Sequence, residues 1–255
     1  MLHKNLKGLT SFHLHILAMA LMLGDHLWAT LLPQQEWLTC LGRLAFPIFA
    51  FMIVEGYFHT RNIRRYLLRM LLFAAISEIP FDLIYGSTLF YPFHQNVLWT
   101  FLLAFGCMSL IQWVWTKSRQ WKNALLALAV PAITAAGVCF AGWLLGNLLR
   151  VDYYGAGVLT VLVFYFFHGR RWYDLAGQLV CLTMIHGVLL AGMVYPISLF
   201  GLSFDFPQQA LALLALVPIW LYRGKQGPHS RPIQLLYYGF YPVHMAILSL
   251  LFALR

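Results

Sequence analysis

Long apolar stretches separated by short polar connections follow one another along the whole chain. Most are close to the ~20 residues that an α-helix needs to cross a bilayer. They predict helices over Ser11–Leu32, Leu38–Phe58, Tyr66–Ile84, Val97–Trp115, Leu125–Leu145, Tyr154–Phe167, Leu175–Tyr195, Ala210–Tyr222 and Ile233–Leu254. The sixth and eighth are the shortest, and they either extend into flanking residues or lie tilted or buried among other helices. We therefore predict an all-α, polytopic membrane helix bundle of about nine transmembrane helices.

Composition supports a membrane protein. Only 10% of the 255 residues are charged and 61% are hydrophobic, whereas about a quarter of the residues of a soluble domain are charged. The four cysteines are scattered without a CxxC pair, so we expect neither a disulfide framework nor a metal site. We find no internal repeat and no linker, and treat residues 1–255 as one domain. Glycine-rich nucleotide loops, HExxH and GxSxG are also missing from the sequence.

Basic residues fall into alternate connections. The segment before the first stretch and the connections after the second, fourth, sixth and eighth together hold 14 of the 17 Lys and Arg. The opposite set holds only Arg150 and Arg255, and Arg43 lies inside the second stretch. This alternation is what the positive-inside rule predicts for nine spans of a plasma membrane, with the N-terminus cytoplasmic and the C-terminus extracytoplasmic. The basic connections are expected to contact anionic lipids rather than nucleic acid.

Few ionisable side chains lie inside the apolar stretches, and such residues mark functional sites or specific pairs. Asp25 and His26 lie about 10 Å inside the outer end of the first stretch. Most other polar residues lie at a similar depth, and these are Arg43, Glu78, Asp82, His94, Asn96, His186, Tyr241 and His244. Only His13, His15 and Glu55 lie toward the cytoplasm. This distribution predicts one site in the outer half of the bundle.

Neighbouring helical residues point in different directions, so Asp25 is not expected to orient His26 as a triad carboxylate would. Asp25 is expected to pair with Arg43, whose guanidinium otherwise lies uncompensated in the membrane. His26 then faces a cavity, on the same face of the first helix as His15. The alternative is that the Asp25–Arg43 pair and Glu78 only clamp helices together, while His26 bonds a backbone carbonyl.

Several segments together resemble one family. The segments are "MLGDHLW", "LGRLAFPIFAFMIVEGYFHTRN", "ISEIPFDL", "HQNVLWTFLL", "DYYGAGVLTVLVFYFF" and "FYPVHMAIL". In this order, from about Leu6 to Leu254, they resemble the TraX family of polytopic membrane proteins. The resemblance implies a link to acetylation of the N-terminus of conjugative F-type pilin. It also implies similarity to membrane acyltransferases that carry acetyl groups from cytoplasmic acetyl-CoA to acceptors across the membrane.

Acyl transfer from a thioester needs a base and donors for the developing oxyanion. His26 is the candidate base, or a nucleophile that carries the acyl group, and Arg43, Asn96 and His244 are candidate donors. The candidate catalytic residues are Asp25, His26, Arg43 and His244; the candidate substrate-binding residues are Glu55, Glu78, His94, Asn96 and Tyr241; the candidate acetyl-CoA-binding residues are His15, Arg61, Arg64 and Arg65. The expected partners are acetyl-CoA, an extracytoplasmic pilin or envelope amine or hydroxyl, and the lipid bilayer.

Two other functions fit the same residues. A proton-coupled transporter or exporter would use the histidines and carboxylates as a proton relay. The lack of a sequence repeat, and the clustering of polar groups on one side of the membrane rather than across it, argue against a transporter. A non-catalytic pilus or envelope assembly factor would tolerate substitution of His26.

Overall fold

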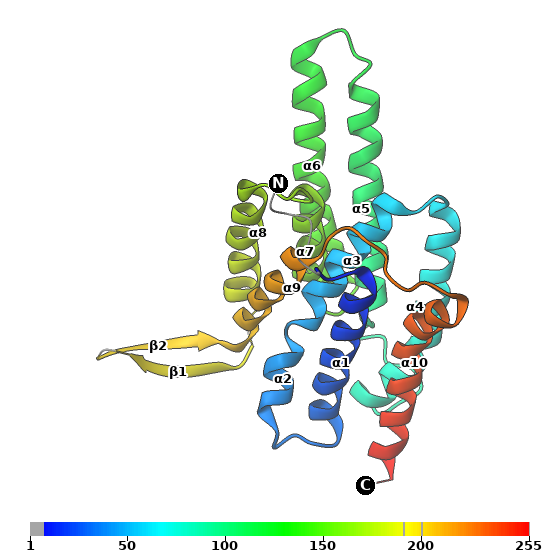
Figure 1. Cartoon of the computed structure of the whole chain (residues 1–255), viewed down its shortest axis with the longest axis vertical. Coiled ribbons are helices and arrows are strands. Elements are labelled where there is room, and N and C mark those ends of the chain that lie inside the picture. Colours follow the sequence, from blue (N-terminus) through cyan, green and yellow to red (C-terminus); the bar gives the residue numbers. More distant parts are fainter. Residues whose placement is uncertain (1–7, 191, 200, 255) are drawn as a thin grey trace. The chain divides into compact units, whose positions relative to one another are not determined.

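The computed structural model describes residues 8–190, 192–199 and 201–254. Most of them are helical (Figure 1). The elements are α1 (Ser11–Thr30), α2 (Glu36–Gly42), α3 (Ala45–His59), α4 (Ile63–Tyr85), α5 (Val97–Ser118), α6 (Ala124–Leu148), α7 (Tyr154–Phe166), α8 (Trp172–Met184), η1 (Ile185–Leu189), β1 (Val194–Leu199), β2 (Leu202–Pro207), η2 (Gln208–Ala215), α9 (Leu216–Leu221) and α10 (Arg231–Ala253). They form two compact units, of which unit 1 covers Met1–Met52 and Gly169–Arg255 and unit 2 covers Ile53–His168.

Each of the nine predicted stretches contains a helix. Within the described residues, four helical segments are long and apolar enough to cross a membrane: Glu36–His59, Val97–Ser118, Ala124–Leu148 and Arg231–Ala253. The chain is thus a helical membrane protein. The count of nine spans and the orientation of the termini stay predictions.

The structure corrects the predicted helices in two places. The second stretch is not one helix, because α2 ends at Gly42 and α3 begins at Ala45. The seventh does not remain helical to Tyr195, because α8 passes into the π-helical turn η1 and the chain then enters β1. Pro196 disfavours helical backbone at Tyr195, which explains the strand there. The antiparallel hairpin of β1 and β2 is the exception to the all-α prediction.

In unit 1, α1 packs against α2 and α10. The polypeptide ahead of α1 pairs with the connection between α9 and α10: the Leu9 N–H donates to the Leu221 carbonyl at 3.0 Å, and the Ser11 N–H donates to the Lys225 carbonyl at 2.9 Å. These two connections are both predicted to be cytoplasmic, so their pairing agrees with the basic-residue pattern. Lys4, Lys7 and Arg255, which also entered that pattern, lie outside the described residues.

Unit 2 is built around α5, α6 and α7. Helices α6 and α7 approach closely where Gly146 meets Gly155, since a Cβ on Gly146 would lie 2.7 Å from the Gly155 Cα. Small residues at such crossings let the two helix backbones approach closely, and this packing favours association of helices in a membrane, where the hydrophobic effect does not drive it. The connections before α5 and before α7 also pair, through Gln95 N–H to the Arg150 carbonyl at 2.9 Å. Both are predicted to lie outside.

Candidate functional site

The break between α2 and α3 brings Arg43 to the face of α1. The Arg43 Nη2 donates to Asp25 Oδ1, and these two side chains are only 18% and 19% exposed. Gly42 makes room for this approach, because a Cβ there would lie 2.7 Å from the Asp25 Cγ. The predicted Asp25–Arg43 pair is therefore confirmed, and the glycine before Arg43 is part of its geometry.

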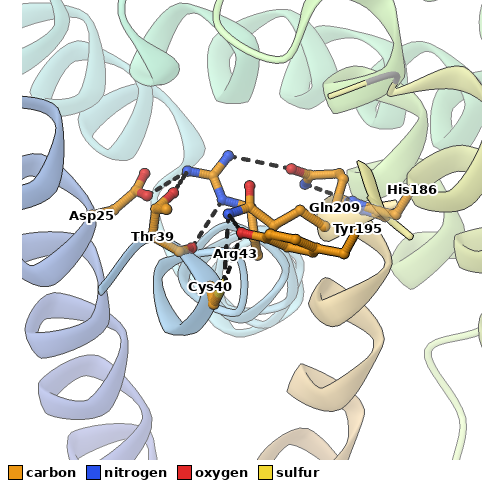
Figure 2. Close-up of polar contacts among 8 residues, drawn as sticks. Asp25, Thr39, Cys40, Arg43, His186, Tyr195 and Gln209 are labelled. Carbon is orange, nitrogen blue, oxygen red and sulfur yellow. Dashed lines mark hydrogen bonds and ion pairs between the residues drawn. The ribbon is translucent and has the colours of Figure 1, made fainter. Parts of the chain in front are cut away.

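Arg43 also connects α2 to η2 and η1 (Figure 2). Its Nε donates to the Thr39 carbonyl at 3.2 Å, and its Nη2 to the Thr39 Oγ1 at 3.0 Å. Its Nη1 donates to Gln209 Oε1 at 3.3 Å, and Gln209 Nε2 lies 3.0 Å from His186 Nδ1. The amide nitrogen can only donate, so His186 accepts at Nδ1. His186 is fully buried in η1, and π-helical turns often occur at functional sites.

A smaller set of contacts joins the hairpin to α2 beside this network. The Tyr195 hydroxyl lies 3.5 Å from Cys40 Sγ and 3.5 Å from Glu36 Oε2. Gln208 Nε2 donates to the Tyr195 hydroxyl at 3.2 Å. The base of the hairpin is thus fixed next to the residues that hold Arg43.

His26 contacts α10. Its Nδ1 lies 2.7 Å from His244 Nε2. The two rings are within 8° of parallel, with centroids 5.0 Å apart. A short contact between edge nitrogens at this centroid separation is an in-plane hydrogen bond rather than a face-to-face stack. The prediction that His26 would be left free by the Asp25–Arg43 pair is therefore wrong for one of its two nitrogens.

The second nitrogen of His244 fixes the direction of this bond. His244 Nδ1 lies 2.6 Å from the Phe240 carbonyl, which can only accept, so this nitrogen carries the hydrogen. In a neutral His244, Nε2 is then an acceptor for the Nδ1–H of His26. A neutral His26 consequently presents a lone pair at Nε2, for which the described residues provide no hydrogen-bond donor. The alternative in which His26 bonds a backbone carbonyl is not what the structure contains.

His15 and Tyr241 also lie along the contact between α1 and α10. The His15 ring stacks on Tyr237 with centroids 4.0 Å apart, and its Nδ1 lies 2.8 Å from the Ser11 carbonyl. Tyr241 is buried, with its ring centroid 6.1 Å from that of His26. The predicted shared face of His15 and His26 is thus the face that α1 turns to α10.

Four of the five predicted substrate-binding residues belong to unit 2, and three of them, Glu78, His94 and Asn96, form contacts near its predicted outer end. Asn96 is fully buried at the N-cap of α5, where Oδ1 accepts from the Leu98 N–H at 3.0 Å. Its Nδ2 donates to the Ala74 carbonyl at 2.9 Å and to Glu78 Oε2. His94 Nε2 lies 3.5 Å from Asp152 Oδ1. These bonds connect α4, α5 and the start of α7, which favours a structural role for Asn96.

Glu55 and the predicted acetyl-CoA-binding residues Arg61, Arg64 and Arg65 are also in unit 2. Glu55 Oε1 lies 2.6 Å from Nε2 of His168, which sequence reasoning did not select. Arg61, Arg64 and Arg65 are exposed at the start of α4. They are accessible to an anionic ligand or to lipid headgroups.

Known proteins agree with the sequence resemblance. The sequence model of the family described as "TraX protein" matches residues 11–252. The chain belongs to the TraX family. It is also 26% identical over 253 residues to the "Probable fimbrial assembly protein FimC, serogroup H1" of Dichelobacter nodosus, covering 94% of each chain. No solved structure matches this TraX-family chain.

The site of this TraX-family protein includes residues that sequence reasoning missed. Thr39, Gln208 and Gln209 were not selected, and His186 was noted only for its depth. The adjacent Gln208 and Gln209, which open an otherwise apolar stretch, were the signal that this segment makes polar contacts. Unit 1 brings together a largely buried cation held by the Asp25 carboxylate and, at the next residue of α1, an imidazole whose Nε2 lone pair has no donor among the described residues.

Proposed function

We propose that this protein is an integral-membrane acyltransferase that moves an acetyl group from cytoplasmic acetyl-CoA to an extracytoplasmic amine or hydroxyl. The observation that carries the proposal is the chain from the Phe240 carbonyl through His244 to His26. It holds His26 in the tautomer whose Nε2 can take a proton or attack a carbonyl carbon. Family membership supports the same class of reaction.

In the proposed reaction, the amine nitrogen or hydroxyl oxygen of the acceptor attacks the thioester carbonyl carbon. His26 Nε2 removes the proton from that acceptor atom as it attacks. The new bond to the acyl carbon forms, the C–S bond breaks, and the proton passes from His26 to the leaving thiolate. The other route places the acyl group on Nε2 before the acceptor takes it. In both routes His244 is a positioning residue, because its Nε2 is used by His26.

Arg43 is the candidate group for the negative charge that develops on the carbonyl oxygen. Asp25, Thr39 and Gln209 fix the position of its guanidinium. A fixed cation needs no reorganisation during the reaction, which is how preorganised groups lower a barrier. The exposed Arg61, Arg64 and Arg65 are the candidate contacts for the phosphates of acetyl-CoA.

The acceptor is proposed to be a pilin or another envelope component. A second function, a non-catalytic assembly factor, is favoured by the name of the fimbrial assembly relative. The two readings differ in one measurable property, which is turnover.

The test is acetyl-CoA turnover by the purified full-length protein in lipid nanodiscs, with pilin-type peptides and envelope amines offered as acceptors and products identified by mass spectrometry. We expect free CoA and an acetylated acceptor in equal amounts. A folded protein that supports fimbriation in cells but releases no CoA with any acceptor would favour the assembly factor.

A further inference from the structure

One face of the β1–β2 hairpin is apolar. The register places Tyr195 opposite Phe206 and Ile197 opposite Phe204. Directly opposed residues and alternate residues of a strand share a face, so these four side chains form one surface. Ile197 is 36% exposed and Phe204 48% exposed, whereas Tyr195 and Phe206 nearer the base are half-buried. The apolar surface is therefore open away from the base.

The other face of the hairpin carries all of its serine and aspartate side chains, beside Val194, Pro196 and Pro207 nearer the base. Ser198 lies opposite Ser203, with their hydroxyl oxygens 3.0 Å apart, and Asp205 is exposed two residues farther along β2. An isolated two-stranded hairpin is at best marginally stable in water. We therefore expect the apolar face of this hairpin to be buried against another apolar group and its polar side chains to be hydrated.

Exposed apolar side chains on α8 and η1 precede the hairpin along the chain. Val180, Met184 and Val188 follow one another at intervals of four residues, so they lie on one side of α8 and η1, and all three are exposed. Exposed Met193 then leads into β1. In Figure 1 the two strands run across the direction of α8. If α8 crosses the membrane as predicted, the hairpin lies along the membrane surface.

We propose that the hairpin is a membrane-surface anchor, with its apolar face in the headgroup–acyl boundary of the bilayer and its serines and Asp205 toward water. The occupant of the apolar face is phospholipid. Amphipathic elements take this position because it buries the apolar side and leaves the polar side hydrated. Gln208 and Gln209 directly follow β2, so the anchor would hold the segment that bonds Arg43. This inference concerns the surface of the protein and holds whether or not the protein transfers acyl groups.

The test uses a photoreactive residue on each face of the hairpin in the full-length protein in its native membrane. In one variant p-benzoylphenylalanine replaces Phe204, and in the matched control it replaces Ser203. After irradiation, mass spectrometry of the peptide that carries the hairpin identifies the cross-linked molecule. We expect phospholipid adducts at position 204 and no phospholipid adducts at position 203.

Three outcomes would overturn the proposal: cross-linking of position 204 to a second copy of the chain or to another polypeptide, equal lipid labelling at both positions, or no adduct at 204. The pair Ile197 and Ser198 repeats the comparison on β1, so the test does not depend on the folding of one variant. Each variant is first shown to be monodisperse by size-exclusion chromatography.

Discussion

Asp25 and Arg43 should depend on each other for the stability of unit 1, but unequally. Arg43→Gln leaves the Asp25 carboxylate without the one donor found for it among the described residues. Asp25→Asn leaves Arg43 its bonds to Thr39 and Gln209. Breaking a buried pair costs ~3–5 kcal/mol, so we expect about 3 kcal/mol for Asp25→Asn and about 4–5 kcal/mol for Arg43→Gln.

The double variant removes both charges and should be milder than either single change. It loses mainly the bonds of Arg43 to neutral groups, so its cost should be about 2 kcal/mol. The sum of the single costs then exceeds the cost of the double variant by about 5–6 kcal/mol, within the range measured for close charge pairs. Equilibrium unfolding by SDS in mixed micelles measures all three variants. Asp205→Asn on the hairpin is the control, expected within about 0.5 kcal/mol of the parent protein. Additive single costs would refute the pairing.

Further expectations follow from the same contacts. Gly42→Ala should lower the free energy of unfolding by about 1–3 kcal/mol, because the added methyl group meets Asp25. The control Gly137→Ala, with open space around it, should be neutral or slightly stabilising. Equal effects of the two substitutions would contradict the close approach of Gly42 to Asp25. Asn96→Leu should cost about 3 kcal/mol, by loss of an N-cap and of a buried partner for Glu78, and should leave acyl transfer per folded molecule unchanged; loss of transfer at unchanged stability would make Asn96 a substrate group instead. A reporter fused after Arg255 should be extracytoplasmic and one within residues 117–122 cytoplasmic, and the reverse result would overturn the nine-span topology.

The sequence was sufficient to predict the Asp25–Arg43 pair because charges in the apolar stretches are few and each needs a partner. It was also sufficient to predict a helix in each of the nine stretches, because a long apolar segment in a bilayer must satisfy its backbone hydrogen bonds internally, as a helix does. The sequence was not sufficient to predict the contact between His26 and His244, because 218 residues separate them and only the packing of α10 on α1 makes them neighbours.

The hairpin and the glutamine contacts were missed for a different reason. Residues 202–206 alternate between apolar and polar side chains, but most of the residues around them are apolar, so the period of two is hard to distinguish from a continuing hydrophobic run. Gln208 and Gln209 were visible as polar residues in an apolar setting, yet nothing in the sequence indicated that Gln209 would bond Arg43 or that Gln208 would bond Tyr195. Tertiary contacts decided both.

The most direct test of the central claim is acyl transfer and thermal stability measured on the same purified His26→Gln sample. Glutamine keeps a hydrogen-bonding group beside His244 but cannot accept the proton that a base must take. We predict a protein as stable as the parent whose transfer rate is lower by about 10²-fold or more, the contribution typical of general base catalysis. A His26→Gln protein that is folded and fully active would contradict the catalytic assignment of His26.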